Sequence, residues 1–167
     1  MGANAFGADD ALCWDTSAVT KMEGTFWETT TFNSQLVWDT SSVTNMKATF
    51  YHAEAFNSQL VWDTSKVTSM GHTFWNAEAF NSELVWDTSS VTDMSYTFAN
   101  AQAFNQPLDW DTSKVTNMEY TFYYATNFNR QLVWDMSQVS TLHMAFYGAH
   151  AFNQPGISTW DVSKVSD

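Results

Sequence analysis

The dipeptide Trp-Asp recurs at a nearly constant interval along the 167-residue chain, and this repeat limits the possible folds more than any other feature. Its tryptophans are Trp14, Trp38, Trp62, Trp86, Trp110, Trp134 and Trp160. Five intervals are 24 residues long and the last is 26. A unit of this length cannot bury a core of its own, but stacked units share a continuous one. The period therefore predicts a single repeat-solenoid domain over residues 1–167, with about seven coils, the last incomplete.

The apolar columns of the repeat indicate what each coil contains. With each Trp as repeat position 0, position 5 is Val, position 8 mostly Met, and positions 12 and 18 are Phe in most units. Apolar residues at positions 5, 8, 12 and 15 have the spacing of one helical face. The segment from position 21 to position 1, which contains Leu-Val-Trp-Asp, is typical of a short strand. We therefore expect a leucine-rich-repeat-like coil, with one short β-strand and one short helix or 3-10 turn. A three-sided β-helix is the alternative.

Charge and cysteine content exclude several classes of function. The chain has 6 basic and 18 acidic residues, a net charge of −12, which argues against nucleic-acid binding. It has no apolar run near the length needed to insert in a membrane. Residues 1–12 lack the basic and apolar regions of a signal peptide. Cys13 is the only cysteine, so an internal disulfide is excluded. The four histidines share no repeat position, and we expect no metal, no cofactor, no catalytic residues and no enzyme activity.

Polar columns accompany the apolar ones. The aspartates of position 1 are Asp15, Asp39, Asp63, Asp87, Asp111, Asp135 and Asp161. We expect them to accept backbone N–H groups of the following turn, and a row of calcium ions is the less favoured alternative because no second acidic column supplies enough oxygens. Asn at position 19 predicts an internal amide ladder. Threonines at positions 2, 6 and 11 raise the possibility of an ice-binding face, although bonds to turn backbone explain them more simply.

Two surface columns are candidates for binding. The first is a stripe of rings that follow or flank the position-12 Phe, either outer packing or an exposed strip for a partner. Its members are Trp27, Tyr51, Trp75, Tyr96, Tyr120, Tyr123 and Tyr147. The second is position 23, which points outward if Leu at position 22 and Trp at position 0 point inward. Its members are Val37, Val61, Val85, Asp109 and Val133.

The unit from Ala103 to Ala125, AFNQPLDWDTSKVTNMEYTFYYA, resembles the repeat of BspA-type leucine-rich-repeat surface proteins. The resemblance extends from Phe6 to Val165, with a departure at position 11, where Thr stands in place of Met. It implies a leucine-rich-repeat-like solenoid at the cell surface or outside the cell, with an adhesion role and no catalytic residues. The expected function is therefore recognition of a protein or glycan. The alternatives are a self-assembling array that associates through open solenoid ends, and an ice-binding protein that uses the threonine rows.

Overall fold

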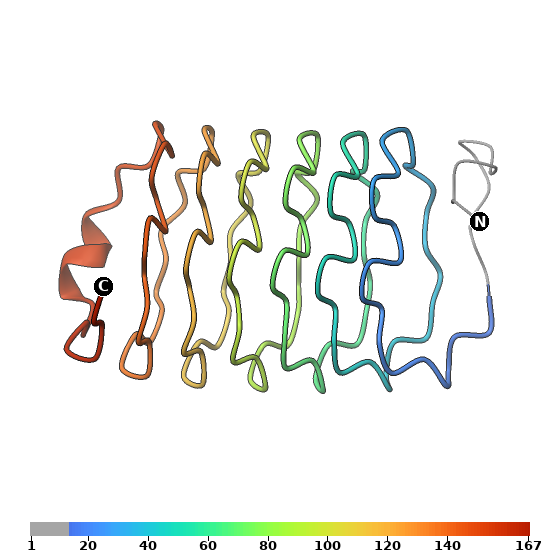
Figure 1. Cartoon of the computed structure of the whole chain (residues 1–167), viewed down its shortest axis with the longest axis horizontal. Helices are drawn as coiled ribbons and strands as arrows, with labels where there is room; N and C mark the ends of the chain where they lie inside the picture. The colour runs from blue at the N-terminus through green and yellow to red at the C-terminus, as the bar shows by residue number, and fades with distance from the viewer. Residues whose placement is uncertain (1–13) are drawn as a thin grey trace.

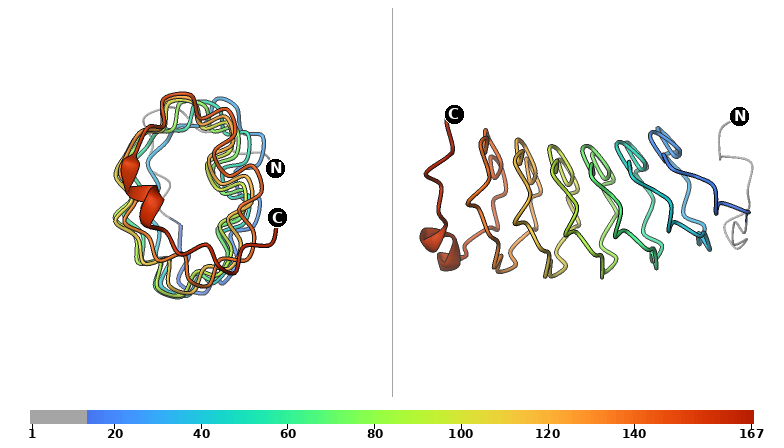
Figure 2. Two further views of the ribbon diagram at one scale, coloured as in Figure 1. Left: turned by 90° about the vertical axis from the view of Figure 1, so that its left-hand side faces the viewer. Right: turned by 90° about the horizontal axis from the view of Figure 1, so that it is seen from below.

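The computed structural model describes residues 14–167, in which successive repeat units lie side by side as a stack of coils (Figure 1). Seen along the stack, the coils superpose on one oval outline (Figure 2). Residues 1–13, which include Cys13 and the segment compared with signal peptides, lie outside the described residues. The repeat of the sequence is therefore matched, unit for unit, by a repeat in space.

Backbone hydrogen bonds join neighbouring coils along one side of the stack. Single parallel bridges connect the residues of position 7, from Lys21 with Asn45 to Asn117 with Thr141. Beyond each bridge, the N–H groups of positions 8, 10, 12 and 14 donate to carbonyls of the next coil. In the third described coil the donor to acceptor distances are 2.9 Å from Met70, 2.8 Å from His72, 2.9 Å from Phe74 and 2.9 Å from Asn76. Only alternate N–H groups enter this ladder, which leaves the others free for bonds within the coil.

The helix expected over positions 5 to 15 is replaced by a run of turns. Over residues 14–167 the only helix is the 3-10 helix η2, Pro155–Thr159, and β structure is limited to isolated bridges. Thr73, Trp75 and Ala77 each donate an N–H to the carbonyl three residues earlier, at 3.1–3.2 Å. His72 and Asn76, the third residues of two of these turns, have φ of 62° and 58°, as type II turns require. The prediction of a helix is wrong for these coils. Alternate N–H groups, which in a helix would bond to carbonyls of the same segment, instead donate to carbonyls of the neighbouring coil.

In the segment expected to form a strand, side chains alternate between buried and exposed, but the segment forms no strand. Leu84 and Trp86 are buried, whereas Val85 between them is 84% exposed. At Leu84 and Trp86 no backbone hydrogen bond joins the neighbouring coils, and the rings of Trp62 and Trp86 stack with centroids 6.2 Å apart. The position-12 rings of Phe74 and Phe98 are 5.6 Å apart. The wider ring spacing on the Trp side is accompanied by the loss of coil-to-coil backbone bonds.

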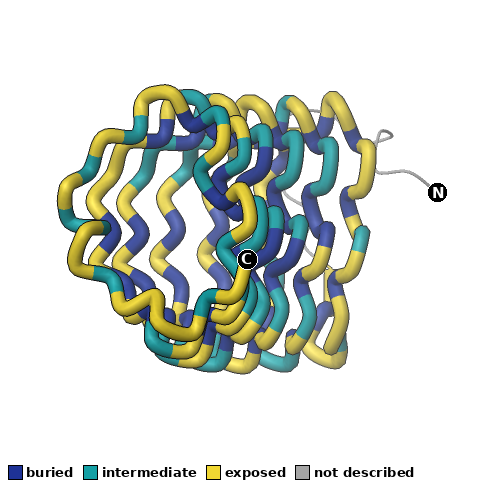
Figure 3. The backbone as a smooth tube through the Cα atoms, turned by 60° about the vertical axis from the view of Figure 1, so that its left-hand side comes forward, coloured by how far each residue is buried: buried dark blue, intermediate teal, exposed yellow. Residues whose placement is uncertain are grey.

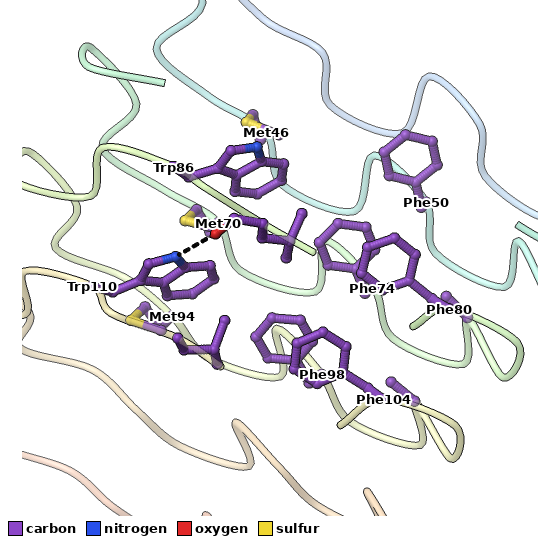
Figure 4. Close-up of a cluster of buried hydrophobic side chains, with 14 of the residues drawn as sticks. Met46, Phe50, Met70, Phe74, Phe80, Trp86, Met94, Phe98, Phe104 and Trp110 are labelled. Atoms are coloured by element: carbon purple, nitrogen blue, oxygen red, sulfur yellow. Dashed lines mark hydrogen bonds between the residues drawn. The ribbon is translucent and has the colours of Figure 1, made fainter. Parts of the chain in front are cut away.

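The core is a set of stacked side-chain columns that runs from Met22 to Val139. Figure 3 shows buried stretches of the chain recurring from coil to coil. Phe98 is fully buried between the position-12 rings of its neighbours, and Phe104 packs on it at 4.1 Å within the same coil (Figure 4). Thr97 lies beside these rings, also fully buried, and its hydroxyl reaches the Met94 carbonyl at 2.7 Å and the Met70 carbonyl at 3.0 Å. Each coil therefore contributes one layer to a core that no coil could form alone.

Candidate functional site

The structure brings the seven candidate aromatic residues into one continuous row of ring contacts. The centroid distances are 4.4 Å for Trp27–Tyr51, 5.0 Å for Tyr51–Trp75, 4.8 Å for Trp75–Tyr96, 4.6 Å for Tyr96–Tyr120, 5.2 Å for Tyr120–Tyr123 and 5.6 Å for Tyr123–Tyr147. Four residues that were not among the seven candidates also contact this row: His52, His72, Tyr124 and His143. His52, His72 and Tyr124 occupy positions 10 and 14 and have positive φ, whereas His143 occupies position 9.

Ring orientation limits what the aromatic row can bind. Tyr96 and Tyr120 are stacked with an interplanar angle of 16°, and Tyr123 and Tyr147 with 17°. Stacked rings turn their faces toward one another, so these faces are not available to a flat ligand. At the ends of the row Trp27 and Tyr147 are about half exposed, at 52% and 54%. The row is thus largely outer packing, with free surface mainly at its two ends.

His72 packs within this row, and its burial there changes its pKa. Its ring stacks on Tyr96 with centroids 4.7 Å apart and contacts Trp75 at 5.2 Å. Burial lowers the pKa of His72, and the positive charge of Lys47 lowers it further, while Asp93 acts in the opposite direction. Histidine at this position is consequently neutral at physiological pH and packs as an aromatic ring.

The position-23 column forms the most exposed apolar surface of the described chain. Val61, Val85 and Val133 are 81%, 84% and 83% exposed, and Val37 is 55% exposed. Asp109 replaces Val in one coil and is also exposed. Positions 21 and 1 are two residues away on either side, so their side chains point to the same face. We call these three columns the outer face: an apolar row between a row of mostly Gln and a row of Asp.

Each position-1 aspartate of the outer face accepts hydrogen bonds from the serine two residues later. The Asp63 carboxylate accepts the Ser65 N–H at 3.0 Å and the Ser65 hydroxyl at 2.7 Å. These two bonds, the hydroxyl bond first, lower the pKa of Asp63 below its usual value of 3.8. The same serine contacts lower the pKa of the other position-1 aspartates. The expected turn capping is confirmed, and the outer face carries a row of ionised carboxylates at neutral pH.

Replacing Ser65 with alanine is expected to raise the pKa of Asp63 toward 3.8, because the Ser65 hydroxyl bond is the largest cause of its depression. A pKa depressed by folding contributes stability at pH values above the unfolded value, and this contribution is lost as the pH falls through the folded value. The variant should therefore lose less stability than wild type on acidification below about pH 4. Carboxyl NMR titration measures the pKa. Ser90→Ala is the control, and equal pKa values in wild type and Ser65→Ala would contradict the assignment.

The threonine rows differ in exposure. Position 2 is buried, and Thr64 there donates to the Asp87 carbonyl at 2.9 Å. Position 11 is buried in the coils from Thr49 to Thr121. Position 6 is exposed, and Thr92 donates to the Thr68 carbonyl at 3.2 Å. Among the three rows only position 6 faces solvent along the described coils, whereas an ice-binding face needs two outward rows.

Position 19 carries the expected ladder of asparagines, at a corner of the coil. The Asn57 Oδ1 accepts the Asn81 N–H at 2.7 Å, and the Asn81 Oδ1 accepts the Asn105 N–H at 2.9 Å. These residues are exposed or half-buried, so the expectation of an internal ladder is wrong in its location. The ladder satisfies backbone N–H groups where the chain turns into the extended segment.

Between residues 14 and 167, no three His, Cys, Asp or Glu side chains are grouped closely enough to hold a metal ion. In this part of the chain there is also no helix with the length and apolar character needed to cross a bilayer.

A groove of about 460 Å³ opens on the outer face at the one break in the period. One wall is the segment 131–136, and the other consists of Gly156, Thr159, Trp160 and Asp161. At a regular junction, between Trp86 and Trp110, the corresponding space is about 90 Å³. The 26-residue interval was the sequence signal for this feature, but the interval alone does not show that a groove results.

Comparison with known families gives one family. A family model described as "Mycoplasma protein of unknown function, DUF285" matches residues 1–109, 60–133 and 131–167. These overlapping matches span the whole chain, as expected for a protein made of tandem repeats. Comparison with curated proteins gave no match, and neither did comparison with solved structures.

Proposed function

The chain belongs to the DUF285 family, and we propose that it is a non-enzymatic binding module that recognises a protein partner through its outer face. The observation that carries this proposal is the row of Val61, Val85 and Val133, each more than 80% exposed and flanked in every coil by an ionised aspartate. Regular apolar side chains in water are costly unless a partner covers them. Within the proposal, the scaffold is a repeat solenoid in which each coil adds one copy of the same contact set.

The resemblance to BspA-type leucine-rich-repeat proteins supports a surface or secreted location with an adhesion role. The outer face also bears on the choice between a partner and self-assembly. Two copies that met through this face would bring their aspartate rows together, and like charges repel. A partner of different charge therefore suits this face better than a second copy of the chain.

The proposal is tested by changing one surface at a time. The triple variant Val61→Ser, Val85→Ser and Val133→Ser is expected to bind its ligand about tenfold or more weakly, because three apolar contacts are lost. Ligands are first found by screening wild type on arrays of purified surface proteins and glycans, and affinities are then measured by biolayer interferometry. Since the three valines are exposed, the free energy of unfolding should change by only about 0.5 kcal/mol or less.

The matched control changes the exposed ends of the aromatic row instead, as Trp27→Ser with Tyr147→Ser. Its affinity is expected to stay within about twofold of wild type, because most of the row is packed against itself. Loss of binding in this control, with the valine variant unaffected, would assign recognition to the aromatic row and overturn the proposal for the outer face.

A further inference from the structure

The two most exposed tyrosines of the chain lie against each other at one end of the aromatic row. Tyr124 is 36% exposed and Tyr147 is 54% exposed, whereas the other four tyrosines are half-buried. The two rings belong to successive coils, with centroids 5.6 Å apart and planes inclined at 69°. An oxidant in the solvent therefore reaches both members of this pair of phenols.

Backbone pairing between coils places these two residues opposite each other. The Tyr124 N–H donates to the Tyr147 carbonyl at 2.8 Å, which is the position-14 bond of the ladder between coils. At the other junctions the same bond joins Glu28 to Tyr51, His52 to Trp75, Asn76 to Ala99 and Asn100 to Tyr123. Within residues 14–167, tyrosine therefore faces tyrosine at one of the five junctions that have this bond.

Neighbouring residues fix the Tyr124 ring beside Tyr147. A Cβ atom at Gly148 would lie 2.7–2.9 Å from three atoms of the Tyr124 ring, so this ring packs directly on the backbone of Gly148. The Tyr123 ring contacts both partners, at 4.7 Å from Tyr124 and 5.6 Å from Tyr147. The charge of the Tyr147 phenol is also the main cause that raises the pKa of Tyr124 above its usual value of 10.0. The two phenol groups are thus held close together.

Ring orientation distinguishes this pair from the closer contact between Tyr96 and Tyr120. Two phenols can be joined when a carbon ortho to one hydroxyl group meets the ortho carbon of the other, edge to edge. Tyr96 and Tyr120 are 4.6 Å apart but stack at 16°, which places face against face, and both are half-buried. Tyr124 and Tyr147 are steeply inclined and exposed, and exposed side chains reorient rapidly. Their ring edges can therefore meet.

We propose that Tyr124 and Tyr147 are a modification site, at which a haem peroxidase with hydrogen peroxide forms a dityrosine cross-link between two successive coils. Each phenol gives up one electron and its hydroxyl proton and becomes a phenoxyl radical. The two radicals join through a carbon–carbon bond between their ortho positions. The hydrogen of each joined carbon then leaves as a proton, and a proton returns to each phenolic oxygen. The peroxide accepts the two electrons and two protons and becomes two water molecules.

The cross-link acts as a staple between the coils. It closes the chain between residues 124 and 147 into a covalent loop, which restricts the unfolded chain and so stabilises the folded stack. The site lies in the aromatic row and not on the outer face, so this inference goes beyond the proposed function and does not depend on it.

The test treats the full chain with a haem peroxidase and limiting hydrogen peroxide, followed by trypsin digestion and mass spectrometry. Trypsin cleaves after Lys114, Arg130 and Lys164, which places Tyr124 in the peptide 115–130 and Tyr147 in the peptide 131–164. Tyr147 is the only tyrosine in the second peptide. The expected product is a monomer in which these two peptides are joined, with a mass two hydrogens below their sum. Tyr124→Phe and Tyr147→Phe are each expected to abolish this product and its blue dityrosine fluorescence.

Matched controls remove other phenols of the same row. Tyr123→Phe and the double variant Tyr96→Phe with Tyr120→Phe are expected to keep the joined peptides. Gly148→Ala keeps every tyrosine but displaces the Tyr124 ring, so it is expected to lose most of the product. Circular dichroism and the urea midpoint establish whether this variant is folded.

The stapling role is tested by thermal unfolding of the purified cross-linked monomer. Its melting temperature is expected to lie about 5 °C above that of the untreated chain, because a covalent loop restricts the unfolded state. Tyr124→Phe treated with the same oxidant should keep the melting temperature of its untreated form, which separates the cross-link from other effects of oxidation.

Three results would overturn the inference: cross-linked dimers in place of the monomer, joined peptides that persist in Tyr124→Phe but disappear in Tyr123→Phe, or a cross-linked monomer that melts like the untreated chain. If Gly148→Ala is unfolded, the comparison of Tyr124→Phe with Tyr123→Phe decides the outcome. These results are separate from those for the outer face, because the triple valine variant retains both tyrosines.

Discussion

Replacing Phe98 with alanine is expected to lower the free energy of unfolding by about 4 kcal/mol. Phe98 is fully buried, and its ring stacks with Phe74 at 5.6 Å, Phe122 at 5.5 Å and Phe104 at 4.1 Å. The substitution removes the ring and leaves a cavity in the middle of the stack. Because each coil contacts only its neighbours, a weak layer in the middle also uncouples the two halves. Urea unfolding followed by circular dichroism and tryptophan fluorescence measures both effects.

Tyr123→Ala is the matched control for this prediction, because it also removes an aromatic ring but from the partly exposed row. We expect a loss of about 1 kcal/mol, comparable with one aromatic pair. If Phe98→Ala cost no more than this control, the position-12 column would not be the main core of the stack. Two separate urea transitions in Phe98→Ala, where wild type shows one, would show directly that the halves had been uncoupled.

Replacing Thr97 with valine is expected to cost about 2 kcal/mol. Valine keeps the shape of the side chain but removes the single hydroxyl proton, which lies within hydrogen-bond distance of two carbonyls. The Met94 and Met70 carbonyls would then lose a donor in a place that water does not reach, since Thr97 is fully buried. The measurement is again the urea midpoint, with the m-value checked for constancy.

The exposed threonine of the same coil provides the control. Thr92 also donates its hydroxyl to a carbonyl of the preceding coil, Thr68, at 3.2 Å. Water can replace that bond, so Thr92→Val should change the free energy of unfolding by about 0.5 kcal/mol or less. Equal effects at Thr97 and Thr92 would mean that burial of the hydroxyl does not determine its contribution.

The sequence predicted which residues share a column and which columns are buried. Met94 and Phe98 are buried as their repeat positions require, and Val85 points outward because its neighbours at positions 22 and 0 point inward. Such assignments succeed because every unit repeats the same pattern, so one coil's pattern applies to the others. The row from Trp27 to Tyr147 was likewise assembled correctly from its repeat positions.

The candidate site was less predictable from the residues. The orientation of the rings in the aromatic row depends on the backbone of positions 10 and 14, whose positive φ is unusual for Tyr96 and Tyr124. The groove at Trp160 depends on how two extra residues are accommodated. An insertion can form a bulge, a loop or a turn of helix. The residue types from Gln154 to Thr159 do not determine which of these forms.

The sequence by itself therefore determined the period, the register of the columns and the charge of the surface. Only the tertiary structure decided the local conformation between positions 8 and 15. The 3-4-3 spacing of apolar residues fits a helix and a run of turns equally well. The turns form because the next coil offers carbonyls at positions 7, 9, 11 and 13, and the N–H groups of Met70, His72 and Phe74 bond to them across the stack. Those acceptors belong to residues more than 20 positions away in the sequence. A prediction from the local sequence pattern therefore cannot take them into account.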